Sequence, residues 1–172
     1  AADPAAELVL NEAFCEHDDE TGLAIRPLLY DCVKRLKGDG VPIHAVGLQG
    51  HLKPLLPHDY GAFADWVAAV SELGVTVKIT ELDVDDRGLP ADIAARDRIV
   101  AETLSAFLGP VLKVRSVNEV IAWQLSDRYS WYRTLPDYPP GQKARSHLFD
   151  DAMEPKPATF AVETAFGQSA AR

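Results

Sequence analysis

Two carboxylates, Glu81 and Asp83, stand at the end of the apolar segment VKITELDV, residues 77–84. A run of this composition predicts a strand that is covered on both faces. Because side chains alternate along a strand, both acids are expected on the same side of it. A rigid strand end can hold a carboxylate in a fixed position for chemistry. The segment therefore predicts a functional site as well as a core strand.

Polar residues also end the other predicted strands, which span residues 7–11, 44–50, 75–84 and 117–127. The residues concerned are Asn11 with Glu12, Gln49 with His51, Glu81 with Asp83, and Trp123 to Asp127. Apolar residues at helical spacing predict helices at 25–40, 60–74 and 91–108, the last ended by a Gly-Pro pair, and a final helix that starts near Lys156. Alternating strands and helices indicate parallel βαβ units, whose ligands bind at the carboxyl ends of the strands.

The composition is that of a globular protein with a core. Of the 172 residues, 47% are hydrophobic and 25% charged, and the net charge is −9. The acidic balance argues against a nucleic-acid partner, and no run of about 18 apolar residues predicts a membrane span. The densest acidic run, residues 16–20, is interpreted as a solvated loop. Cys15 and Cys32 form neither a disulfide framework nor a zinc site, and a single bridge between them stays open.

Four ordered motifs resemble glycoside hydrolase family 10, the endo-β-1,4-xylanases. VPIHAVGLQGHL is similar to the family's sixth strand, GVTVKITELDV to its seventh, WQLSDRYSW to its eighth, and LFDDAMEPKPATFAV to its closing helix. ADPAAELVLNEAF resembles the fifth strand. The resemblance implies an α/β fold of the (β/α)8 TIM-barrel type, of which this chain holds only strands five to eight and their helices. We expect residues 1–172 to form a single partial domain.

A full barrel of this type needs about 250 residues, and strands one to four have no counterpart here. In the family those strands carry the general acid/base, so the resemblance implies that this residue is absent from the chain. The Asn11-Glu12 pair looks like part of the family's acid/base motif, but its surroundings place it at the fifth strand. Glu12 is therefore not expected to be the catalytic acid.

The resemblance assigns roles to seven residues. Glu81 matches the catalytic nucleophile, and His51 and Asp83 match the pair that supports it. The residues that match sugar contacts are Asn11, Gln49, Trp123 and Trp131. Asp127 and Tyr129 are expected to brace their loop. Two departures from the family pattern, Ala13 and Gln124, alter the surface offered to the sugar.

The implied activity is retaining hydrolysis of internal β-1,4-xylosidic bonds, with xylan or xylo-oligosaccharide as substrate and no metal or organic cofactor. The family's habit implies a secreted or periplasmic enzyme, although the chain shows no signal peptide. The alternative is a non-catalytic half barrel that binds xylan-type sugars or self-associates. Its open strand edges would also allow complementation by the missing N-terminal half.

Overall fold

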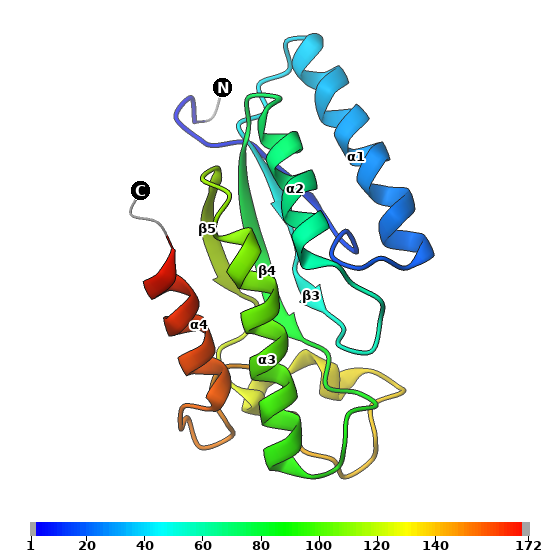
Figure 1. Cartoon of the computed structure of the whole chain (residues 1–172), viewed down its shortest axis with the longest axis vertical. Coiled ribbons are helices and arrows are strands. Elements are labelled where there is room, and N and C mark those ends of the chain that lie inside the picture. Colours follow the sequence, from blue (N-terminus) through cyan, green and yellow to red (C-terminus); the bar gives the residue numbers. More distant parts are fainter. Residues whose placement is uncertain (1–2, 170–172) are drawn as a thin grey trace.

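The computed structural model describes residues 3–169. Within that range, five strands form a parallel sheet with the longest strand at its centre (Figure 1). The strands are β1 (Val9–Glu12), β2 (Ala45–Leu48), β3 (His51–Leu52), β4 (Thr76–Val84) and β5 (Val117–Ala122). β1 pairs with β2, β2 pairs with β4, and β4 also pairs with β3 and β5. Every pairing is parallel, as the alternation of strands and helices predicted.

Helices α1 (Glu20–Gly38), α2 (Tyr60–Ser71), α3 (Ile93–Val111) and α4 (Pro157–Gln168) follow the strands in turn. An aspartate caps each of the first three, because the side chains of Asp19, Asp59 and Asp92 accept a backbone N–H of the first turn. α4 starts with a proline, which is tolerated where the N–H has no helical partner. Two short 3₁₀ helices, η1 (Asp127–Tyr129) and η2 (Trp131–Thr134), lie between β5 and α4.

The hydrophobic core lies between the sheet and the helices. Val77 and Ile79 of β4 are fully buried there, together with Phe63 of α2 and Phe107 of α3. The opposite face of β4 carries Lys78, whose Nζ lies 3.0 Å from Glu7 and 2.7 Å from Glu119. The strand is largely covered, as predicted, because none of its residues is exposed, but ion pairs rather than apolar contacts cover Lys78 on its second face.

Several element ends differ from the sequence prediction. α1 starts five residues earlier than predicted, because the Asp19 cap fixes its first turn. α3 continues to Val111 through Pro110, which lacks the N–H for one backbone hydrogen bond of the last turn. β5 ends at Ala122 instead of residue 127, since the chain turns into η1. Cys15 and Cys32 are both free thiols, so the bridge left open by the sequence does not form.

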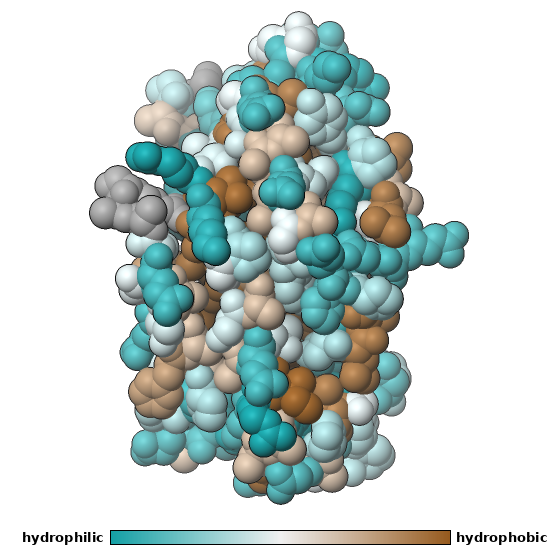
Figure 2. Space-filling view, viewed as in Figure 1, coloured by the Kyte–Doolittle hydropathy of each residue, from teal (hydrophilic) through white to brown (hydrophobic). Residues whose placement is uncertain are grey.

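The outer face of the helices is a mixed surface, on which hydrophobic residues appear as separate spots among hydrophilic ones (Figure 2). Large hydrophobic side chains are exposed around the two outer strands, among them Leu8, Val9, Ile121 and Leu125. None of the helices in residues 3–169 is long and apolar enough to cross a membrane.

Candidate active site

Glu81 and Asp83 lie on the two sides of one imidazole. Nε2 of His51 is 3.3 Å from Oε2 of Glu81, and Nδ1 of His51 is 2.7 Å from Oδ1 of Asp83. His51 starts the short strand β3, which pairs with the end of β4 so that His51 stands beside Asp83 in register. The strand ends of β3 and β4 thus bring together the three residues that the sequence predicted as a catalytic group.

Asp83 is a buried carboxylate that the surrounding loop saturates with donors. Its side chain has no exposed surface. Besides His51, the hydroxyl of Tyr132 donates to Oδ1 at 2.8 Å, and the indole Nε1 of Trp131 donates to Oδ2 at 2.8 Å. Burial of a carboxylate without partners would be costly, whereas here three donors satisfy its oxygens. Asp83 therefore fixes the orientation of His51 and of the η2 loop together.

The charges around His51 favour its protonated form. Burial opposes protonation, but the hydrogen bond and charge of Asp83, with the charges of Glu81 and Glu16, raise the pKa of His51 above its ordinary value. A protonated imidazole has N–H groups on both nitrogens. It can then face both carboxylates as a cation, with one N–H directed to each of them.

Asn11 reaches Glu81 across an intervening strand. Its Nδ2 lies 3.3 Å from Oε1 of Glu81, and its Oδ1 accepts a hydrogen bond from Thr80 at 2.8 Å. β2 separates these strands and has Gly47 opposite Asn11. A Cβ at Gly47 would lie only 2.2 Å from Oδ1 of Asn11. The absence of a side chain at residue 47 therefore allows Asn11 to hold the second oxygen of Glu81.

The two tryptophans flank the imidazole. The ring of Trp131 is 5.3 Å from that of His51, and the ring of Trp123 is 6.3 Å away in an edge-on arrangement. Trp123 is 47% exposed, so its ring is open to a ligand. Trp131 has its N–H bound to Asp83 and its ring 4.5 Å from the ring of Tyr132, so that it is only partly exposed. Gln49 is partly buried, and its backbone carbonyl accepts the backbone N–H of Glu81 at 2.7 Å.

Two neighbouring residues that the sequence assigned to a solvated loop are in fact buried. Glu16 is 1% exposed and His17 is 2% exposed, so that interpretation is wrong for these two residues, whereas Glu20 is exposed. Sequence reasoning also missed Tyr132 and Thr80, which hold Asp83 and Asn11. The only signal for Tyr132 was its place directly after Trp131. The side chain of Glu12, by contrast, accepts the N–H of its own neighbour Ala13.

The loop after β5 is anchored by Asp127, as expected. Its fully buried carboxylate accepts from Nζ of Lys156 at 2.8 Å and from the backbone N–H of His147 at 2.9 Å. Tyr129 is 61% exposed, and its side chain has no hydrogen bond or ion pair among residues 3–169, so it does not brace the loop as expected. Gln124 turns its side-chain oxygen to the backbone N–H of Trp131 at 2.8 Å and so orients that ring.

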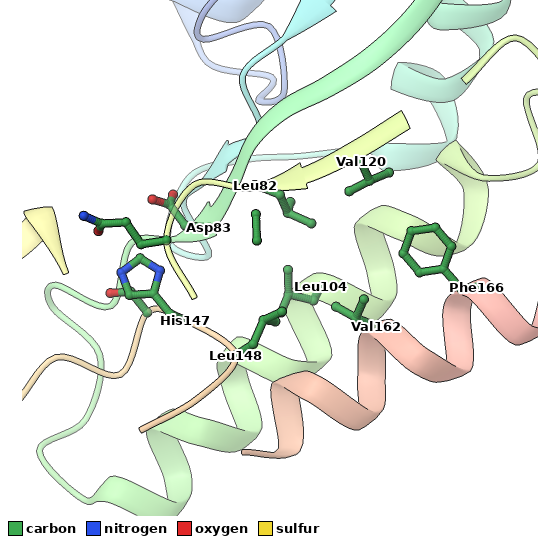
Figure 3. A pocket seen from close by; sticks show the side chains of 11 residues that line it. Leu82, Asp83, Leu104, Val120, His147, Leu148, Val162 and Phe166 are labelled. Carbon is green, nitrogen blue, oxygen red and sulfur yellow. The ribbon is translucent and has the colours of Figure 1, made fainter. Parts of the chain in front are cut away.

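A separate cavity of about 120 Å³ lies behind Asp83, between the sheet and helices α3 and α4 (Figure 3). Its wall is mostly apolar and includes Leu104, Val120, Val162 and Phe166. His147 lies at its polar end, and neither ring nitrogen has a hydrogen-bond partner among residues 3–169. Burial lowers the pKa of His147 to about 4, so the ring is neutral near pH 7. This cavity does not include Glu81, but Asp83 lines both the cavity and the carboxylate site.

Comparison with known proteins finds similarity to xylanases over nearly the whole of this chain. Endo-1,4-beta-xylanase 5 of Pyricularia oryzae is 35% identical over 172 residues, which are 99% of this chain and 40% of that protein. Xylanase 10B of Thermotoga maritima superposes with a TM-score of 0.83 at 26% identity, covering 97% of this chain and 48% of the xylanase. Xylanase 10B of Thermotoga petrophila, solved with xylobiose, gives 0.80 at 25% identity, with 97% and 48% covered.

The chain thus spans about half the length of the proteins it matches. Its fold is half of a (β/α)8 barrel, with β1, β2, β4 and β5 as the fifth to eighth strands, which confirms the fold prediction. Residues 1–165 match the sequence profile of Glycosyl hydrolase family 10. The chain therefore belongs to Glycosyl hydrolase family 10.

Proposed function

We propose that this chain supplies the nucleophile half of a retaining endo-β-1,4-xylanase, with residues 1–172 forming one partial domain. The observation that carries the proposal is the setting of Glu81 at the end of β4. His51 faces one of its oxygens at 3.3 Å, and Asn11 faces the other at 3.3 Å. Two oriented donors on a strand-end carboxylate support a role that requires a fixed, ionised group.

In the proposed reaction, Glu81 attacks the anomeric carbon and forms a glycosyl-enzyme, which water then hydrolyses. A retaining mechanism also needs a protonated carboxyl group roughly 5–5.5 Å from the nucleophile. Asp83 is unsuited to that role, because its side chain is fully buried and held by three donors. We infer that the acid/base comes from residues beyond these 172. The reaction as proposed uses no metal and no organic cofactor.

The proposed substrate is xylan or a xylo-oligosaccharide. The rings of Trp123 and Trp131 beside His51 suit the apolar faces of a pyranose. The amide of Gln49 can both donate to and accept from sugar hydroxyls. A solved neighbour of this chain holds xylobiose, which supports the same class of ligand here.

We propose that the protein is secreted or periplasmic, because enzymes of its family generally are. One solved neighbour is described as an intracellular xylanase, so family membership alone does not assign a compartment. A reporter fusion of the full reading frame would separate the two locations.

The proposed reaction is tested on an aryl xylobioside with a good leaving group, which needs little protonation. We expect Glu81→Gln to abolish release of the phenol, because the amide cannot act as the nucleophile. Glu12→Gln is the matched control, since it removes a nearby carboxylate that does not contact His51. Equal loss in both variants, or no loss in Glu81→Gln, would count against the proposal.

The alternative function is a non-catalytic half barrel that binds sugar or self-associates. It is favoured by the two outer strands: among the described strands, β1 pairs only with β2, and β5 pairs only with β4. Such edges are templates for further pairing, and exposed Val9 and Ile121 lie on them. Light scattering of the 172-residue polypeptide tests this alternative. Dimers that bind xylobiose without turning over the aryl substrate would support it.

A further inference from the structure

Two consecutive side chains in the loop after β1 accept hydrogen bonds from the loop that carries His51. Oε1 of Glu16 accepts the backbone N–H of Gly50 at 2.7 Å. Nε2 of His17 accepts the backbone N–H of Lys53 at 2.8 Å. His51 lies between these two amides in the sequence. We call Glu16 and His17 the acceptor pair.

The acceptor pair is itself fixed on helix α1. The guanidinium of Arg26 donates to the carbonyls of Cys15 at 2.8 Å and His17 at 3.2 Å. Gly22, one turn earlier on α1, lies so close that a Cβ there would be 2.1 Å from the carbonyl oxygen of His17. The backbone on both sides of Glu16 is thus seated on a rigid helix, and its carboxylate has a defined position.

The amide that Glu16 holds belongs to a turn with little freedom. Gly50 has φ +80°, a conformation that other residues rarely adopt. A Cβ at Gly50 would also lie 2.9 Å from Cγ2 of Ile79. The turn therefore packs directly on β4 and sends the chain into β3, where His51 meets Glu81 and Asp83.

We propose that Glu16 is a positioning residue for His51, acting through the N–H of Gly50, with His17 fixing the far end of the same loop. The importance of Glu16 for catalysis rests on the proposed role of Glu81. The effect of Glu16 on the position of His51 is independent of that role. Because His51 touches one oxygen of Glu81, a shift of the 49–53 loop moves the donor away from the nucleophile. The loop of residues 16 and 17 then belongs to the active-site support, although it contacts no substrate.

The electrostatics agree with this geometry. The charged groups that face His51 are Asp83, Glu81 and Glu16, and all three raise its pKa against the effect of burial. Burial raises the pKa of Glu16 itself, while the Gly50 N–H and the charges of His51 and Arg26 oppose that rise. The His51 pKa is therefore a readout of where the loop places the imidazole.

The test measures the His51 pKa by NMR of its imidazole nitrogens in the 172-residue chain. In Glu16→Ala we expect it to fall by about one unit or more, because the ring loses both the clamp and a neighbouring charge. Glu16→Gln keeps an oxygen acceptor at the same place and removes only the charge. It is expected to retain more of the elevated pKa than Glu16→Ala, and Glu12→Ala is expected to leave it unchanged.

A second measurement does not depend on the alanine variant being folded. In the wild-type chain, the Gly50 amide proton should titrate together with the Glu16 carboxyl group, and this titration should vanish in Glu16→Gln. Circular dichroism confirms that the variants compared are folded. Equal falls of the His51 pKa in Glu16→Gln and Glu16→Ala would mean that Glu16 acts only through its charge and not through its hydrogen bond to Gly50. That result would overturn the positioning role. A Gly50 amide proton whose chemical shift does not follow the titration of Glu16 would overturn the positioning role as well.

These outcomes are independent of turnover. If the acceptor pair sets the His51 pKa but Glu81→Gln leaves hydrolysis of the aryl xylobioside intact, the positioning inference stands and the proposed function fails. If the His51 pKa is unchanged in the Glu16 variants while Glu81→Gln abolishes hydrolysis, the positioning inference fails and the proposed function stands.

Discussion

Nδ1 of His51 lies 2.7 Å from Oδ1 of Asp83, a carboxylate whose side chain has no exposed surface. A buried charge of this kind needs its partners, and breaking such a pair leaves an uncompensated group. The pair connects the interior of the loop after β5 to the imidazole that faces Glu81. The protonation of His51 therefore depends on a carboxylate that is fully shielded from solvent.

Replacing Asp83 with asparagine should lower the pKa of His51. The substitution keeps the shape but removes the nearest negative charge, and an opposite charge at this distance shifts a pKa by about 1–3 units. NMR titration of the His51 ring measures the effect. Asp85→Asn is the matched control, because Asp85 pairs with Arg87 instead. An unchanged His51 titration in Asp83→Asn would contradict the geometry.

Gly47→Ala should destabilise the chain and displace Asn11 from Glu81. The new methyl group would lie 2.2 Å from Oδ1 of Asn11 and 2.9 Å from Cγ2 of Thr80, so the side chains must move. Overpacking of this kind costs about 1–3 kcal/mol, measured by urea unfolding. Gly109→Ala in α3 has open space around it and should be neutral or slightly stabilising. Equal stability of the two variants would show that Asn11 does not depend on Gly47.

The site residues at the end of β4 could be predicted from the sequence because the pattern that indicates them is local. The period of two predicted that Glu81 and Asp83 share a side; both contact the same imidazole, although the pairing of β4 with β5 shifts register between Ile79 and Leu82. Apolar spacing likewise located the helices, though not their first and last turns. The partners of Asp83 were not accessible, because Trp131 and Tyr132 reach it from 48 and 49 residues away through an irregular loop. The burial of Glu16 was missed for another reason, because acids in a run are usually solvated.

His17 should make stability depend on pH in the acidic range. Burial lowers its pKa from 6.5 to about 4, so between these values the unfolded chain binds a proton that the folded chain excludes. Stability carried by His17 is therefore lost as pH falls through this window, by up to about 1.4 kcal/mol per pH unit. His17→Gln offers a non-titrating oxygen to Lys53 N–H, so its urea midpoint should fall less than that of wild type. Parallel profiles of the two proteins from pH 6.5 to 4 would refute this account.

The isolated 172-residue polypeptide should favour an activated substrate over the polymer. General acid assistance contributes about 10²–10⁴-fold to such reactions, and the proposed mechanism places that acid outside these residues. Hydrolysis of polymeric xylan should therefore suffer more than hydrolysis of an aryl xylobioside with a phenolic leaving group. Parallel assays, with light scattering to record the oligomeric state, give the ratio. Ordinary rates on xylan by a monodisperse monomer would mean that Glu12 has to be reconsidered as the acid.

The most direct test of the central claim is covalent labelling by a 2-fluoro-xylobioside with an activated leaving group. Such a reagent reacts with the nucleophile of a retaining glycosidase and leaves a stable glycosyl-enzyme. Peptide mass mapping then locates the sugar. The account predicts a single label on Glu81, reduced by competing xylobiose and absent from Glu81→Gln. A label on Glu12 or Asp83 with Glu81 unmodified would contradict it.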